Sequence, residues 1–374
     1  MSQTTERLGA VDSLRGIAIL MVVFAHTAGW VVPTAPWLKQ VAEVGPRGVQ
    51  LFYVVSAFSL FLSYANRKAD GDFSYGAYFI RRLARIAPMF WIAVALNVAI
   101  YGLAPRYWAP HGLTWSDVAL TVFFANGFKP DAITSVVPGG WSVAVETSFY
   151  LLLPIFFATV RSMRGAIAAA AICLIAGTFA CEWYVATYQA DYPEATKWLP
   201  YAFAWGLWLP SQLPVFALGI VLFYLRGTIP QSRSTTVFWL ALAVYLLAAS
   251  ARAPADGFTR IHVTAAVGLM FLSLAVMNGD IRVLNNRALQ LIGKVSFSIY
   301  LLHMTILSIA HKLAERAGIS ETGNLRFLAA YCVIVLVCVA VSYCAYRLVE
   351  LPGMRLGSKL VRAVDKPAVE LARQ

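Results

Sequence analysis

Long apolar stretches recur along this chain and constrain its fold more than any other feature. A helix needs about 20 largely apolar residues to cross the hydrocarbon core of a bilayer. Ten stretches reach or approach this length, at 11–32, 49–65, 83–103, 141–160, 166–186, 201–225, 236–250, 261–278, 291–311 and 327–347. Only 13% of the residues are charged, whereas soluble domains usually have about 25%. The sequence therefore predicts an all-α, polytopic integral membrane helical bundle with about ten transmembrane helices, and argues against a soluble enzyme.

An eleventh apolar stretch, at 117–128, has only about 12 residues and is too short for a confident span. If it does not cross and the N-terminus is cytoplasmic, about 18 Lys and Arg residues face the cytoplasm and about 10 face outside. If it does cross, about 13 Lys and Arg residues face the cytoplasm and about 15 face outside. Because cytoplasmic loops are rich in Lys and Arg, we expect a re-entrant or interfacial segment here, and both termini in the cytoplasm.

The basic excess, a formal net charge of +12, is explained by this placement of cations in loops on one side of a membrane. We therefore expect the lipid bilayer as a partner and no nucleic acid. Residues 1–352 are predicted to form one membrane domain. Residues 353–374 read as a basic cytoplasmic tail, either a surface helix or a disordered segment.

The first span carries three ionisable residues, Asp12, Arg15 and His26. Such a residue inside a span costs roughly 2.5–3.5 kcal/mol, so these positions are candidates for function. Arg15 and His26 are eleven positions apart and face the same side of a helix, about 16 Å apart along its axis. Asp12 lies one turn before Arg15 and can pair with it. The alternatives are a snorkelling anchor for Arg15 and a hydrogen-bonded core residue for His26.

Two later spans carry further ionisable residues at similar expected depth. If the fourth span enters from outside, Glu146 lies about 8 Å below that surface, close to the depth of His26. A carboxylate beside an imidazole would fix its tautomer and raise its basicity, as a general base requires. We expect His303 to line the same cavity. The alternatives are a structural partner role for Glu146 and a helix–helix contact for His303.

A pair of arginines, Arg82 and Arg85, opens the third span on the cytoplasmic side. Their spacing of three places both guanidinium groups on one helix face, and such paired groups suit phosphate. Arg15 opens on the same membrane side and can join them. Binding of lipid headgroups, or a role in topology alone, is the alternative. The sequence has no metal-ligand constellation, P-loop or G-x-G-x-x-G turn, so we expect no metal and no bound cofactor.

Taken as a set, these motifs resemble the acyltransferase family 3 membrane proteins, the bacterial O-acetylation family. The matching motifs are 12–18 with His26, 48–58, Arg82 with Arg85, 141–146 with Phe149 and Tyr150, 298–303, and 350–352. The family usually has Gly where Ala57 stands. Many members have a second acidic residue or Gln where Thr147 stands, so a mechanism with two carboxylates is not supported.

The resemblance implies an enzyme of the bacterial inner membrane that moves an acyl group, commonly acetyl from cytoplasmic acetyl-CoA, to a hydroxyl of a cell-surface or exported carbohydrate. It implies catalytic roles for His26 and Glu146. The residues expected to bind the acyl donor or the acceptor are Arg15, Arg82, Arg85, Asp12, Trp141, Tyr150, Tyr300 and His303.

The competing hypothesis is a transporter or flippase for a polar lipid-linked sugar, which would also need buried His, Glu and Arg along a path. No inverted repeat is evident to support it. A structural membrane subunit without chemistry is a weaker alternative. The sequence leaves open the acceptor, the acyl group, direct transfer against an acyl-histidine relay, and whether the protein forms a homo-oligomer.

Overall fold

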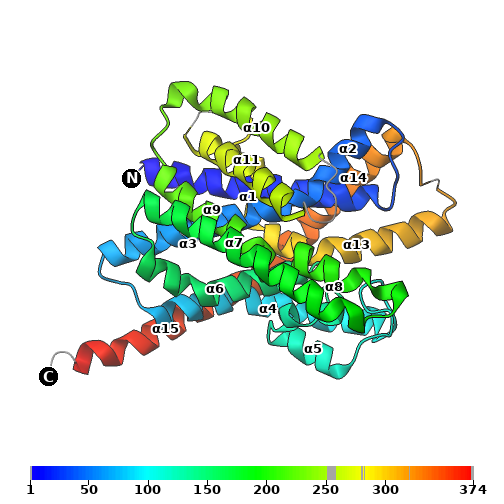
Figure 1. Cartoon of the computed structure of the whole chain (residues 1–374), viewed down its shortest axis with the longest axis horizontal. Coiled ribbons are helices and arrows are strands. Elements are labelled where there is room, and N and C mark those ends of the chain that lie inside the picture. The colour runs from blue at the N-terminus through cyan, green and yellow to red at the C-terminus, as the bar shows by residue number, and fades with distance from the viewer. Residues whose placement is uncertain (1, 251–257, 279–280, 282, 320, 372–374) are drawn as a thin grey trace.

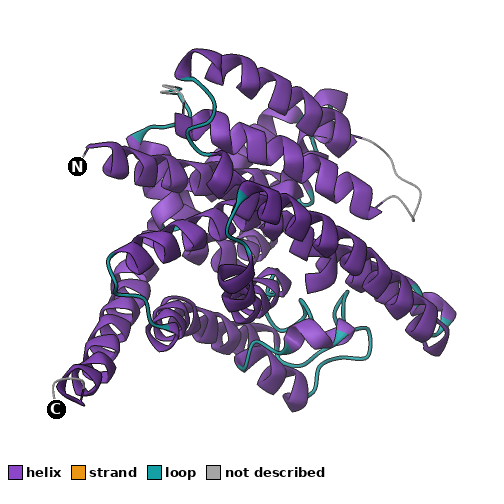
Figure 2. Cartoon of the chain, turned by 60° about the vertical axis from the view of Figure 1, so that its left-hand side comes forward, coloured by secondary structure: helices purple, strands orange, loops and turns teal. Residues whose placement is uncertain are grey.

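The computed structural model describes residues 2–250, 258–278, 281, 283–319 and 321–371, and these fold into helices joined by turns (Figures 1 and 2). The α-helices are α1 (Ser2–Ala28), α2 (Pro36–Val44), α3 (Gly48–Ala69), α4 (Tyr75–Tyr101), α5 (Trp115–Val122), α6 (Trp141–Thr159), α7 (Met163–Tyr188), α8 (Trp198–Ala202), α9 (Leu209–Leu225), α10 (Ser234–Ser250), α11 (Phe258–Asn278), α12 (Arg287–Lys294), α13 (Ser296–Arg316), α14 (Asn324–Ala345) and α15 (Leu351–Leu371). The predicted all-α membrane bundle is confirmed.

Within the described ranges, eight helical segments are long and apolar enough to cross a membrane. They coincide with eight of the ten predicted spans. The other two predictions, 236–250 and 261–278, fall on α10 and α11. With 17 residues, α10 is about 25 Å long, near the lower limit for a spanning helix. The two helices pack against each other, and α11 also packs against α3 and α9.

Close backbone contact places α3 between α1 and α9, which matters because α3 forms one wall of the site. At Gly48, an added Cβ would lie 2.3 Å from the carbonyl oxygen of Ala18 in α1. At Gly219 of α9, an added Cβ would lie 2.3 Å from the carbonyl oxygen of Val54 in α3. Small residues let membrane helices approach closely and pack by van der Waals contact. Larger residues at these two positions would therefore separate the three helices.

The short apolar segment at 117–128 packs against the side of α4. The indole Nε1 of Trp91 in α4 donates to the carbonyl oxygen of Val122 at 2.9 Å, and the rings of Phe90 and Phe124 stack with centroids 5.1 Å apart. Trp91 lies ten residues, or about 15 Å, before the end of α4 at Tyr101. The segment thus lies beside the middle of α4 before the chain continues to α6, and its expected re-entrant placement in the membrane stays a prediction.

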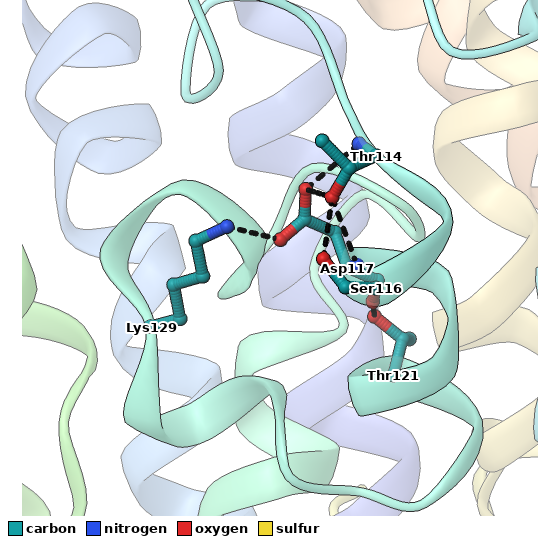
Figure 3. Close-up of polar contacts among 5 residues, drawn as sticks. All are labelled: Thr114, Ser116, Asp117, Thr121 and Lys129. Atoms are coloured by element: carbon teal, nitrogen blue, oxygen red, sulfur yellow. Dashed lines mark hydrogen bonds and ion pairs between the residues drawn. The ribbon is translucent and has the colours of Figure 1, made fainter.

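A buried carboxylate fixes the start of this segment (Figure 3). Asp117 accepts hydrogen bonds from the backbone N–H of Thr114 at 2.8 Å, from its hydroxyl at 2.7 Å, and from Lys129 Nζ at 2.6 Å. Only 2% of the Asp117 side chain is exposed. Burial alone would raise the pKa of Asp117, but the hydrogen bonds from Lys129 and Thr114 hold that pKa below its ordinary value of 3.8. The carboxylate is therefore ionised at neutral pH.

The C-terminal region continues the last long helix instead of separating from it. A π-helical turn at Tyr346–Glu350 joins α14 to α15. Gly353 and Gly357 of α15 lie against Ala84 of α4, where an added Cβ would clash. The helix runs through position 352 without a break. Both termini lie at the same end of the bundle (Figure 1).

Candidate active site

A cavity lies among α1, α3, α4, α6 and α13. The polar side chains in its wall are Arg15, Tyr53, Ser56, Arg82, Arg85, Ser142, Glu146, Tyr150, Ser296 and Tyr300. Six residues that the sequence singled out separately, on four different spans, thus line one cavity.

The wall of this cavity is strongly cationic. Arg15, Arg82 and Arg85 line it together with a single carboxylate, Glu146. Asp12 lies behind Arg15, with 3.8 Å between its carboxylate and the guanidinium. Nε of Arg82 is buried and has no hydrogen-bond partner among the described residues. Because three guanidinium groups meet so little negative charge, the cavity is suited to an anion such as phosphate.

Glu146 is held in place by two hydroxyl groups. Its Oε1 accepts from Ser56 Oγ of α3 at 2.6 Å and from the Tyr150 hydroxyl, one turn further along α6, at 2.5 Å. The Tyr78 hydroxyl donates in turn to the carbonyl oxygen of Tyr150 at 3.3 Å. These bonds fix a carboxylate opposite the arginines and tie α3, α4 and α6 together.

A histidine pair lies further along α1 and α13. Nδ1 of His26 is 3.0 Å from Nε2 of His303, while Nδ1 of His303 is 2.6 Å from the carbonyl oxygen of Tyr300. A carbonyl oxygen only accepts, so Nδ1 of His303 carries the proton and its Nε2 is an acceptor. His26 must then donate from Nδ1. In this neutral pair, Nε2 of His26 keeps its lone pair free, as a general base requires.

The predicted pairing of His26 with Glu146 is wrong, because α6 starts deeper in the bundle than expected. The Tyr300 hydroxyl donates to the carbonyl oxygen of Gly139 at 3.0 Å, just before α6. Glu146 lies seven residues, or about 10 Å, further from the outer end. His303 is consequently the hydrogen-bond partner of His26.

Tyr300 connects the cavity to the histidine pair. Its side chain lines the cavity, its carbonyl oxygen accepts from His303, and the two rings have centroids 5.7 Å apart. Its hydroxyl fixes the turn at Gly139, where φ is +80° and an added Cβ would lie 3.2 Å from that hydroxyl. Trp141, which follows the turn, lies beside Tyr53 with ring centroids 6.3 Å apart.

Two features of the site were not predicted from the sequence. Ser56 supplies one of the two hydrogen bonds to Glu146, and Ser298 donates to the buried carboxylate of Glu350. Each of these serines lies in a recognised motif, but the helix pairing that gives it a partner is a tertiary feature. The described part of the chain holds no group of three or more His, Cys, Asp or Glu residues that could bind a metal.

Sequence comparison identifies the family of this chain. The profile of acyltransferase family 3, described as an acyltransferase domain, matches residues 8–343, which is most of the chain. The chain belongs to this family. It is therefore a multi-pass membrane protein and an acyltransferase.

Curated relatives of this acyltransferase are about one-quarter identical to it over the aligned regions. Acyltransferase MdmB of Streptomyces mycarofaciens is 26% identical over 332 residues, covering 82% of this chain and 81% of that protein. Exopolysaccharide production protein ExoZ of Rhizobium meliloti (strain 1021) is 25% identical over 324 residues, covering 84% and 91%. Nodulation protein 10 of Rhizobium leguminosarum bv. viciae is 26% identical over 181 residues, covering 41% and 46%. No solved structure matches this chain at a significant level.

Proposed function

We propose that this enzyme transfers an acyl group, acetyl from acetyl-CoA, to a hydroxyl of a cell-surface or exported carbohydrate. The observation that carries the proposal is the cavity with three arginines, joined through Tyr300 to a histidine with a free ring nitrogen. The carbohydrate acceptor is supported by the relative that is named for exopolysaccharide production.

The cavity suits the acyl donor. Arg15, Arg82 and Arg85 would bind its phosphate groups, because guanidinium forks match phosphate oxygens. The cavity lies toward the end of the bundle that holds both termini, since Arg82 is near the start of α4 and Ser296 begins α13. We assign this end to the cytoplasm of a bacterial inner membrane, where acyl-CoA is available.

The reaction would take place at His26. Arg15 and His26 are about 16 Å apart along α1, so the thioester arm would extend past Tyr300. Nε2 of His26 would take the proton of the acceptor hydroxyl as the oxygen attacks the thioester carbonyl. The new C–O bond forms, the C–S bond breaks, and the imidazolium returns the proton to the departing thiolate. In a relay mechanism, His26 would instead accept the acyl group first and then pass it to the hydroxyl.

The proposal is tested with purified protein, radiolabelled acetyl-CoA and de-O-acetylated bacterial exopolysaccharide as the probe acceptor. We expect label to enter the polysaccharide. Combined Arg82→Ala and Arg85→Ala substitutions should raise the donor KM by about tenfold or more, because charge-assisted hydrogen bonds are lost. Arg161→Ala, an exposed arginine between α6 and α7, is the control and should leave the KM unchanged.

Two results would contradict this proposal. Unchanged donor affinity in the folded Arg82/Arg85 variant would mean that these arginines serve topology alone. Movement of intact lipid-linked sugar into proteoliposomes without acyl-CoA, with no label transferred, would favour the transporter alternative.

A further inference from the structure

A second pocket adjoins the main cavity. It lies between the end of α3, the start of α4 and the end of α6, at the end of the bundle that holds both termini. Arg82 and Leu60 line both spaces. The two pockets are therefore neighbours that share a guanidinium group.

The second pocket is basic. Arg67, Arg81 and Arg82 line it, and no carboxylate is among its lining residues. The nearest acid with a defined contact, Asp72, binds Arg67 at 2.9 Å but is 68% exposed. Ser63 adds a hydroxyl to the wall. A wall lined by three guanidinium groups is suited to a phosphate group.

Aromatic packing gives this pocket a fixed shape. The rings of Tyr64 and Phe157 are parallel, with centroids 3.9 Å apart. Phe73 contacts both rings edge-on. The Tyr64 and Tyr78 hydroxyls donate to backbone carbonyl oxygens of α6. Because these contacts hold α3, α4 and α6 together, the arginines start from a rigid wall, as a specific site requires.

We propose that this pocket binds the 3′-phosphate of the acyl-CoA donor, while Arg15, Arg82 and Arg85 bind its pyrophosphate. Coenzyme A carries these two anionic groups on opposite sides of one ribose. Two adjoining basic pockets that share Arg82 would offer guanidinium groups to each of these anions. A phosphate monoester carries roughly −1.5 to −2 charges near neutral pH, which Arg67 and Arg81 would balance. The inference rests on the proposed function and assigns a role to two arginines outside the family motifs.

The experiment compares acetyl-CoA with acetyl-3′-dephospho-CoA, a donor that differs only in this phosphate. We expect the wild type to have a KM for the dephospho donor that is higher by about tenfold or more. Combined Arg67→Ala and Arg81→Ala substitutions should raise the KM for acetyl-CoA to a similar value. They should leave kcat and the KM for the dephospho donor unchanged, because the lost contact is made only by the 3′-phosphate.

Arg161→Ala is the matched control, since it removes an arginine from the same end of the bundle outside the pocket. Equal KM values for both donors in the active wild type would overturn the inference and leave the proposed function intact. An equal rise for both donors in the folded double variant would also overturn it, because that would indicate a general electrostatic effect. Absence of acetyl-CoA turnover by the wild type would refute the proposed function itself. If the double variant does not fold, Arg67→Gln and the wild-type comparison keep the test decisive.

Discussion

At the scale of single residues, the proposed mechanism depends on which ring nitrogen of His26 carries no proton. The carbonyl oxygen of Tyr300 fixes the tautomer of His303, and His303 in turn fixes that of His26. A histidine that is oriented through its second nitrogen is a common arrangement for general bases. Here another neutral imidazole provides the orientation that a carboxylate was expected to provide.

His303→Ala removes the group that accepts the hydrogen bond from His26. We expect kcat to fall by about 10²-fold, within the range of losses for acid–base groups. The donor KM should not change, because His303 is not among the residues that line the arginine cavity. His303→Gln should recover part of kcat, since its side-chain oxygen can accept the same bond. Steady-state kinetics with labelled acetyl-CoA measures both constants.

His311→Ala is the control for this series, because His311 pairs with Glu321 near the other end of α13. A kcat for His303→Ala equal to that of the wild type would show that the histidine pair only joins α1 to α13.

The sequence was sufficient to identify these residues but not their contacts. His26, Arg15 and Glu146 stood out because an ionisable side chain in a span is costly. The partner of His26 could not be predicted, because the depth of Glu146 depends on where α6 begins. That position is set by the Tyr300–Gly139 hydrogen bond, which joins residues far apart in the chain.

At the scale of elements, the segment at 117–128 packs along α4. Its apolar length predicted that it would not cross the membrane. Its depth follows from contacts with α4 through Trp91 and Phe90, which no local pattern shows. The ion pair between Asp117 and Lys129 joins the start of the segment to its end.

Lys129→Ala should loosen this segment. It leaves a buried carboxylate with hydrogen bonds from Thr114 alone. Because 41% of the Lys129 side chain is exposed, solvent already weakens the ion pair. We therefore expect the free energy of unfolding to fall by about 1–2 kcal/mol. Faster hydrogen exchange in residues 114–129 would reveal it. As a control, Lys197→Ala breaks an exposed ion pair with Glu194 and should change stability by less than about 0.5 kcal/mol. Equal losses of stability from the two substitutions would contradict this role of Lys129.

The ion pair between Asp117 and Lys129 also predicts that the stability of this segment depends on pH. The pKa of Asp117 is lower in the folded protein than its ordinary value of 3.8, so the unfolded chain binds the proton first as pH falls. The contribution of Asp117 to stability is therefore complete above about pH 5, and declines as pH falls through 3.8 toward the folded pKa. Hydrogen exchange of residues 114–129, corrected for its intrinsic pH dependence, should show constant protection from pH 5 to 7 and loss below pH 4. Loss of protection already at pH 6 would exclude Asp117 as the cause.

At the scale of the whole molecule, both termini lie at one end of the bundle (Figure 2). This placement agrees with the even number of crossings expected from the sequence. Apolar length and charge placement predicted the fold class well, because the bilayer restricts a spanning chain to a few solutions. The status of α10 was harder to predict, since its 17 residues are close to the lower limit for a span.

Reporter fusions test the orientation. We expect a fluorescent protein at the C-terminus to fold in the cytoplasm, and alkaline phosphatase to be inactive after Arg161 and active after Gln189. Phosphatase activity after Ser250 would show that α10 crosses the membrane. Phosphatase activity after Arg161 together with inactivity after Gln189 would reverse the orientation and place the arginine pockets away from the cytoplasmic donor.

The most direct test of the central claim is acyl transfer by His26→Ala beside the wild type, using purified protein and radiolabelled acetyl-CoA. We expect the His26→Ala variant to fold and to bind acetyl-CoA with near-normal affinity through the arginine cavity. It should transfer no label. Transfer at the wild-type rate by the folded variant would contradict the account, because the reaction would then not depend on the free nitrogen of His26.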